Sequence, residues 1–421
     1  MVKRFLFACF CLIFFGTYAQ NGTVSPYSFF GVGDFRSNGT VDNQMMGGVS
    51  MYGDSIHINL QNPAAYSELG LTAYSAAISH RELRLEDSAE RQNSSITNLD
   101  YLAIGLPVGK KVGVGFGLMP YSSVGYRLSE QRLNAEQDTI NNVFTGEGGI
   151  NRVYLSVGFQ PIKNVSLGAT VNYNFGNLEN RRLQTVQNVQ FGTIDNRASK
   201  ITGFDFNYTA TYTPTIKEKY TLYTFLGFDT QVNLTAENTQ RIGSFSTTNG
   251  QDIEVVDVDL EAQNLRNTDL RIPTTFKGGL GFGENKKWFV GGEYSFQKMS
   301  EFQNPFLGVE NATYQDASSY ALGAYFVPKY NSITGYLNRV TYRAGLRYDV
   351  TGLVVNEQAI DDFGITFGVG LPLGATFSNV NLGFELGRRG TTKANLVRES
   401  YLKVNVGLSL NDKWFIKRKI N

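Results

Sequence analysis

The sequence predicts an all-β protein, a 14-stranded antiparallel transmembrane β-barrel with an N-terminal lumenal plug. Three observations lead to this fold class. Apolar and polar residues alternate through most of the chain. Long and short connections between the expected strands also alternate, and the composition suits closely packed strands. The 421 residues include 45 Gly and only 10 Pro, and 13% are aromatic. Such a composition favours strands over disorder.

Hydropathy and charge exclude two classes of protein. The mean hydropathy is −0.21, and no run of 18 apolar residues follows the N-terminus, which excludes a helical membrane protein. A transmembrane β-barrel is not excluded, because its alternating strands average to the hydropathy of a soluble protein. Since 38 Lys and Arg balance 37 Asp and Glu, the net charge gives no sign of a nucleic-acid partner.

Residues 1–19 are predicted to be a cleavable signal peptide. Two basic residues precede an apolar run over residues 5–15, and cleavage is expected after Ala19. A lipoprotein signal ending at Cys9 is the alternative, but its apolar core would be too short. Cys9 and Cys11 both lie in this segment, so the exported chain would contain no thiol for a disulfide, a metal site or a nucleophile.

Beyond residue 95 the apolar residues recur at every second position, as in a strand with one apolar and one polar face. Val153, Leu155 and Val157 alternate in this way with Arg152 and Tyr154. The expected strands cover residues 71–84, 96–108, 112–127, 149–161, 165–178, 201–213, 219–234, 273–283, 288–302, 316–328, 338–350, 360–371, 379–388 and 398–410.

The lengths of the connections favour a membrane barrel over stacked sheets. The connections at 109–111 and 162–164 are short, whereas those at 128–148, 179–200 and 235–272 are long. Long loops would therefore gather at one end and short turns at the other, as in bacterial barrels with periplasmic turns and extracellular loops. A periplasmic β-propeller, the alternative, would not sort its loops in this way.

The segment before the barrel, residues 20–70, does not alternate and is rich in Gly and Asn. Because the barrel's N-terminal end opens to the periplasm, this segment is predicted to be a plug, or hatch, in the lumen; the alternative is a disordered periplasmic linker. The barrel itself would span residues 71–410, followed by a periplasmic tail at 411–421. Inward-facing glycines that would let a plug approach the wall are Gly113, Gly115, Gly117, Gly168, Gly364, Gly368 and Gly370.

Several motifs occur in an order that is hard to obtain by chance. They are Ser25-Pro26-Tyr27-Ser28, Gly31, Gly33 and Asp34, Gly47-Gly48, Asn62-Pro63-Ala64, Pro120-Tyr121, Pro273 and Lys413-Trp414-Phe415. With them the chain resembles the FadL/TodX family of outer-membrane hydrophobic-compound channels, in the form common among Bacteroidota. The resemblance implies a hatch inside 14 strands, with Asn62-Pro63-Ala64 where hatch and barrel meet. It also implies passive uptake of small hydrophobic compounds through a lateral opening at a kink in the third strand.

Pro120 and Tyr121 lie in the middle of that third strand, where proline removes a hydrogen bond of the ladder and forces a bulge or gap. We therefore expect Pro120, Tyr121 and Asn62-Pro63-Ala64 to form one site where plug and gate meet. In the alternative interpretation, Pro120 lies above the bilayer in an extracellular extension.

Charged residues occupy the positions predicted to face the lumen. They are Arg152, Asp205, Lys277, Glu293, Arg343, Arg347, Asp349, Glu385 and Lys403. We expect them to pair with one another or with the plug, because a low-dielectric lumen penalises unpaired charge; an anionic ligand held by Arg343 and Arg347 is the alternative. The two long loops that capture ligand in fatty-acid channels show no apolar helical stripe here.

Nothing in the sequence indicates an enzyme, a cofactor or a metal. His57 and His80 are the only histidines, and neither has a local triad pattern. The acidic loop at 251–261 lacks the spacing of an EF-hand.

Two functions remain for an exported barrel in the bacterial outer membrane. One is a FadL-like channel, and the other is a non-transporting accessory subunit of an outer-membrane protein assembly or secretion complex. The expected partners are outer-membrane lipid and, according to the function, hydrophobic small molecules or another outer-membrane barrel complex. The basic run at 417–419 would lie in the periplasm, either solvated or against a partner or anionic lipid.

Overall fold

The computed structural model describes the chain from residue 22 to residue 413 with four small gaps. The described ranges are 22–37, 39–135, 137–308, 311–374 and 377–413. The predicted signal peptide and most of the predicted C-terminal tail lie outside these residues.

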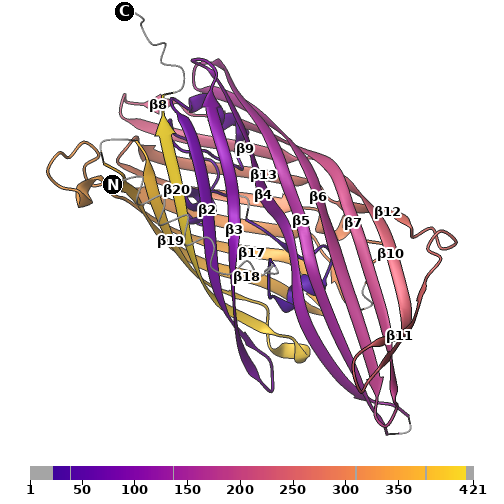
Figure 1. The fold of residues 1–421 in the computed structure, drawn as a ribbon. Helices are drawn as coiled ribbons and strands as arrows, with labels where there is room; N and C mark the ends of the chain where they lie inside the picture. Colours follow the sequence, from indigo (N-terminus) through magenta and orange to yellow (C-terminus); the bar gives the residue numbers. More distant parts are fainter. Residues whose placement is uncertain (1–21, 38, 136, 309–310, 375–376, 414–421) are drawn as a thin grey trace, which may run out of the picture.

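The described residues form a closed barrel of 14 antiparallel strand positions, which confirms the predicted fold class (Figure 1). Around the ring the strands are β2 (Thr72–Glu86), β3 (Arg91–Pro107), β4 (Val112–Leu133), β5 (Thr139–Ile162), β6 (Val165–Val186), β7 (Phe191–Tyr212), β9 (Tyr220–Asp229) continued by β10 (Val232–Ser246), β12 (Asn267–Ile272) continued by β13 (Thr275–Glu284), β14 (Trp288–Gln297), β16 (Ala317–Phe326), β17 (Thr341–Val355), β18 (Gln358–Pro372), β19 (Asn379–Arg389) and β20 (Arg398–Asp412). The barrel closes where β20 pairs with β2, from Thr72 opposite Asp412 to Glu86 opposite Arg398.

Short elements complete the fold. The short strands are β1 (Asp34–Phe35), β8 (Thr215–Ile216), β11 (Asp252–Asp257) and β15 (Ala312–Tyr314), and the one α-helix among the described residues is α2 (Val41–Gln44). The 3-10 helices are η1 (Pro26–Phe29), η2 (Pro63–Glu68), η3 (Met299–Glu301), η4 (Leu337–Arg339) and η5 (Lys393–Asn395). The described helices are too short or too polar for any of them to cross a membrane.

Alternation along each strand separates an apolar outer surface from a polar interior. On β5, Leu155 is 51% exposed on the outside, whereas its neighbours Tyr154 and Ser156 are 2% and 1% exposed. Successive side chains of a strand point to opposite faces, so the local sequence pattern sets which residues face outward. The outer surface thus has the apolar character that a lipid-facing barrel requires.

The predicted long loops at 128–148 and 179–200 are largely strand, which corrects their description as loops. β4 and β5 remain paired out to Leu133 opposite Thr139, and β6 and β7 remain paired out to Gln184 opposite Thr193. Alternation fades there because both faces of the hairpins become polar, yet the backbone ladder continues. These hairpins project from one end of the barrel, at the lower right of Figure 1. We call this end the long-hairpin end and the opposite end the short-turn end.

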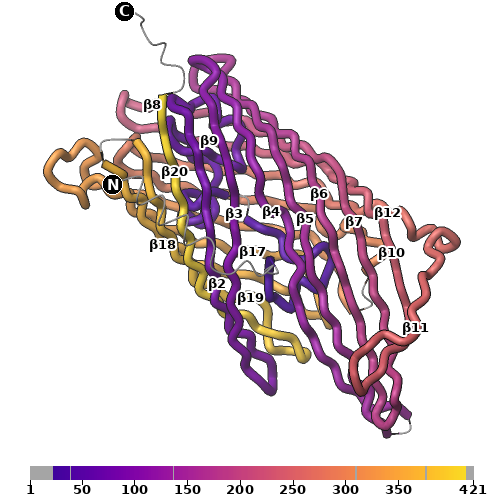
Figure 2. Tube along the Cα trace, in the orientation of Figure 1, coloured from indigo at the N-terminus to yellow at the C-terminus, as the bar shows by residue number. Residues whose placement is uncertain are grey.

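The N-terminal segment, residues 22–70, contacts the inner wall on several sides. A Cβ added to Gly168 would meet the backbone of Ala64 at 2.1 Å, and one added to Gly323 would meet the backbone of Met46 at 2.2 Å. Because β6 and β16 belong to different sides of the ring, the segment lies within the lumen, as the tube trace in Figure 2 illustrates.

Candidate functional site

The barrel wall is incomplete between β3 and β4 toward the long-hairpin end. The two strands pair only from Pro107 opposite Gly113 to Leu102 opposite Leu118. Farther along, β3 pairs with β2 alone, while β4 continues to pair with β5. We call this interval, where the ladder between β3 and β4 is interrupted, the β3–β4 seam.

The N-terminal strand β1 occupies part of this seam. Asp34 and Phe35 pair antiparallel with Ser123 and Ser122 of β4, and the amide of Arg36 donates to the carbonyl of Tyr121 at 2.9 Å. The Phe35 ring remains 44% exposed and lies edge-on to the Tyr121 ring, with the ring centroids 5.5 Å apart. β1 therefore supplies hydrogen bonds to an edge of β4 that β3 leaves unpaired.

The third barrel strand, β4, has an irregular register next to the seam. Pro120 lies opposite Asn151, and the register shifts between Pro120 and Ser122. Tyr121 is therefore the extra residue of a β-bulge. A bulge is expected here because proline cannot donate a hydrogen bond to the neighbouring strand.

The structure places Asn62-Pro63-Ala64 elsewhere on the wall. The Ala64 amide donates to Oγ1 of Thr209 at 3.0 Å, and this motif packs against Gly158 and Gly168 of β5 and β6. Pro120 instead borders a cavity near β1. The two motifs that sequence reasoning joined into one site thus make separate sets of contacts, because sequence order carries no information on their height in the barrel.

The start of the N-terminal segment is tied to the opposite side of the seam by buried polar contacts. Asp34 accepts a hydrogen bond from Thr23 at 2.9 Å and forms an ion pair with Arg389 of β19 at 2.6 Å. Ser25 Oγ donates to the carboxylate of Glu399 on β20. Burial alone would raise the pKa of Asp34, but the nearby Arg389 outweighs it and holds that pKa below its usual value.

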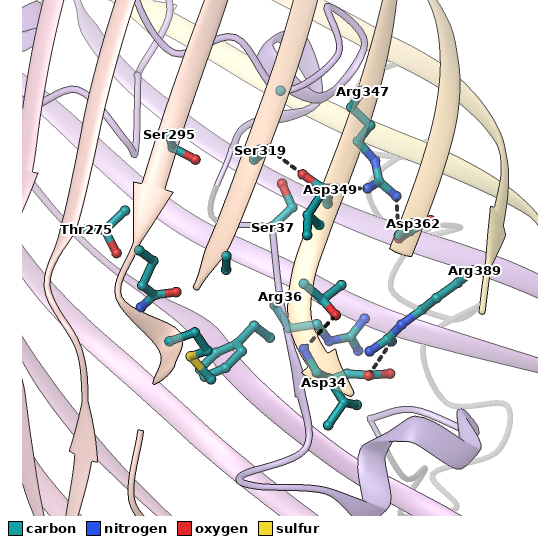
Figure 3. A pocket seen from close by; sticks show the side chains of 18 of the residues that line it. Asp34, Arg36, Ser37, Thr275, Ser295, Ser319, Arg347, Asp349, Asp362 and Arg389 are labelled. Atoms are coloured by element: carbon teal, nitrogen blue, oxygen red, sulfur yellow. Dashed lines mark hydrogen bonds and ion pairs between the residues drawn. The ribbon is translucent and has the colours of Figure 1, made fainter. Parts of the chain in front are cut away.

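The charged residues predicted to face the lumen are inside the barrel, and each has a partner. Arg347 contacts Glu385 at 2.8 Å, Asp362 at 2.9 Å, and Asp349. Figure 3 shows Arg347 beside Asp349 and Asp362, with the ion pair between Arg389 and Asp34 nearby. On the other side of the barrel, Arg152 pairs with Asp205 at 2.7 Å and Lys277 with Asp229 at 3.0 Å.

Three of these predicted residues bind the N-terminal segment directly. Arg343 pairs with Asp42 at 2.6 Å, Lys403 donates to Gln44 at 2.8 Å, and Glu293 accepts from the amide and hydroxyl of Ser50, each at 2.8 Å. Sequence reasoning expected pairing among these charges or with the plug, but it named none of the partners on the N-terminal segment. The available signal was the presence of Asp34 and Asp42 in a segment otherwise poor in charge.

Two cavities within the lumen are lined by residues that the structure describes. The first, of about 450 Å³, lies between the N-terminal segment and the wall near the seam, and charged side chains such as Arg36, Lys277 and Arg389 line it. The second, of about 740 Å³, lies at the short-turn end and is bordered by residues 52–59 and by Glu68.

His57 belongs to the second cavity and takes part in a local polar cluster. Its Nδ1 lies 2.7 Å from Asp54 Oδ2, and its Nε2 lies 3.3 Å from the Asn379 amide nitrogen. Burial would lower the pKa of His57, but the charges of Asp54 and Asp42 outweigh it and raise that pKa. Among the described residues, no group of three or more His, Cys, Asp or Glu side chains has a metal-binding arrangement.

Comparisons with known structures show which fold the barrel has. The toluene transporter TodX of Pseudomonas putida is 17% identical, with a TM-score of 0.59 over 91% of this chain and 100% of that chain. A Pseudomonas aeruginosa FadL homologue is 12% identical, with a TM-score of 0.58 over 89% and 98%. The toluene transporter TbuX of Ralstonia pickettii is 13% identical, with a TM-score of 0.57 over 92% and 99%. The fold is therefore that of the FadL-type barrels.

The family is narrower than this fold class. The family model BamG matches residues 1–421, and the chain belongs to the BamG family. Among the curated proteins, none matches this sequence.

Proposed function

We propose that this chain is a non-transporting accessory subunit of an outer-membrane complex that assembles or secretes proteins. Its apolar outer surface would set it in the outer membrane, with the short-turn end toward the periplasm. The observation that carries the proposal is the N-terminal segment, which crosses the lumen, is ion-paired to the wall and fills part of the β3–β4 seam. In this proposal the segment is a fixed plug.

The ion pairs make plug movement costly. A ligand path past the segment would require separating buried pairs such as Asp34–Arg389 and Asp42–Arg343. Leaving one buried partner uncompensated costs about 3–5 kcal/mol. The first cavity is also lined by charged groups, which suit a hydrophobic compound poorly.

The family match supports the same proposal. The name BamG is compatible with a barrel that works within a larger complex. The transporters TodX and TbuX share the fold, but at such low sequence identity their cargo does not extend to this chain.

One observation favours a second candidate, a channel for small hydrophobic compounds. The bulge at Tyr121 and the interrupted ladder lie in the third strand, where the FadL/TodX resemblance implies a lateral opening. For this function β1 would have to leave the seam.

Membership of a Bacteroidota-type subgroup stays a prediction from the sequence alone.

Purification from native membranes separates the two functions. The protein would be tagged after Asn421, extracted gently, and measured for apparent mass and for the stoichiometry of co-purifying proteins. An accessory subunit should co-purify with another outer-membrane protein at a fixed ratio. A lone barrel no heavier than the 46.7 kDa chain that admits toluene into vesicles faster than protein-free vesicles take it up would overturn the proposal in favour of the channel.

A further inference from the structure

The cavity at the short-turn end contains a carboxylate that the fold leaves without a counter-ion. Glu68 ends η2 and borders this cavity, and among the described residues no hydrogen bond or ion pair reaches its side chain. A Cβ built on Gly53 would lie 3.4 Å from Oε2 of Glu68, which places the carboxylate beside the backbone that leads into Asp54.

Asp54 differs from Glu68 in having all its partners. One oxygen accepts from the amides of Ile56 and His57 at 2.9 and 2.8 Å, and the other lies 2.7 Å from His57 Nδ1. Burial and the negative charge of Asp54 raise the pKa of Glu68 to about 7. A cation bound beside Glu68 would stabilise its ionised form against both effects, whereas Asp54 already has His57 as its partner.

Aromatic rings form another side of the same cavity. Tyr52, Tyr223 and Tyr325 border it, and so do the basic side chains of Lys286, Arg339 and Arg343. The ring of Tyr52 lies 5.0 Å from that of Tyr325 and 5.6 Å from that of Tyr223, measured between centroids. The face of an aromatic ring attracts ammonium and guanidinium cations, and a nearby carboxylate adds a charge-assisted hydrogen-bond acceptor for them.

The three basic side chains at the cavity have other partners. Arg343 pairs with Asp42 at 2.6 Å, and Lys286 and Arg339 lie over the rings of Tyr330 and Tyr336. Among the described residues none of these three forms an ion pair with Glu68.

We propose that this cavity binds an organic cation, an ammonium or guanidinium group, with Glu68 as its counter-ion and the tyrosine rings as its walls. At about 740 Å³ the cavity has room for a complete Lys or Arg side chain. The cation could come from a small molecule or a partner protein, or from this chain itself. β20 ends at Asp412 opposite Thr72, next to Leu71 at the rim of the cavity, and the sequence continues to Lys417, Arg418 and Lys419.

The test uses the full-length protein in detergent, with butylguanidinium as the probe and butylurea as its neutral isostere. Binding is measured by titration calorimetry for the wild type and for Glu68→Gln, which preserves shape and removes charge. Butylguanidinium should bind and butylurea should not, and Glu68→Gln should weaken binding at least tenfold. The matched control is Glu284→Gln, a carboxylate at the same end that pairs with Lys219 and Lys287 at 3.5 and 3.3 Å outside the cavity. It should bind as the wild type does.

A full-length variant with Lys417→Gln, Arg418→Gln and Lys419→Gln separates the sources of the cation. If the probe binds this variant more tightly than the wild type, the chain's own basic run competes for the site. If the two bind alike, the site is open to cations from outside. Equal binding by Glu68→Gln, or no binding by either the wild type or the triple variant, would overturn the proposal. Neither result bears on whether the barrel co-purifies with a partner, so this inference and the proposed function fail separately.

Discussion

The two parts of the N-terminal segment are held in the lumen by partly different physical means. Residues 22–50 pack closely on wall glycines, as Met46 does on Gly323, and in addition form buried ion pairs such as Asp34–Arg389 and Asp42–Arg343, which reach β19 and β17. Residues 51–70 are held by close packing, in which Tyr66 and Ala64 contact wall glycines of β4 and β6. Both parts thus depend on wall positions that lack side chains, and the first part depends in addition on partners of opposite charge.

The largest expected effect comes from breaking an ion pair of the first part. Arg389→Met leaves Asp34 buried without its counter-ion, which should lower the free energy of unfolding by about 3–5 kcal/mol. Urea unfolding of the folded barrel in detergent measures this change. The matched control is Arg241→Met, because Arg241 pairs with Asp257 on an exposed hairpin and such pairs contribute less than about 1 kcal/mol. Equal effects of the two variants would contradict the electrostatic anchoring of residues 22–50.

A smaller effect is expected from adding a methyl group beneath the second part. The Cβ of Gly168→Ala would lie 2.1 Å from the Ala64 amide nitrogen, so the backbone must shift, at a cost of about 1–3 kcal/mol. Gly278→Ala is the control, because its nearest atom is Leu226 Cδ2 at 3.9 Å. The same unfolding experiment applies. If Gly168→Ala were as stable as Gly278→Ala, residues 51–70 would not pack against this wall.

The smallest expected effect depends on pH and concerns the His57–Asp54 pair. Because the folded-state pKa of His57 is raised, the pair contributes fully below the unfolded pKa of about 6.5. This contribution is lost as the pH rises through the folded pKa. His57→Gln should therefore cost about 1 kcal/mol near pH 6 and less near pH 9. A cost that grows with pH would show that His57 is neutral in the folded protein.

The positions of the strands, and whether each side chain points outward or into the lumen, follow from the sequence alone. Alternation around Leu155 predicted correctly which residues point outward, and Arg152 and Arg343, which the alternation assigns to the lumen, form ion pairs with Asp205 and Asp42. The prediction of outward-pointing residues succeeded because a strand's period of two residues is a local property. The charges pair because a low-dielectric lumen penalises unpaired charge.

Only the tertiary structure decided which groups meet. Asp34 and Arg389 are 355 residues apart in sequence, and β1 reaches the β3–β4 seam only because the closed barrel brings β4 and β19 around the same lumen. The tertiary structure likewise determines that the long hairpins remain paired. It also determines that Pro120 and Asn62-Pro63-Ala64 make separate contacts. Alternation sets the face of each residue, but its height and its partner across the lumen depend on strand register and on barrel closure, to which the whole chain contributes.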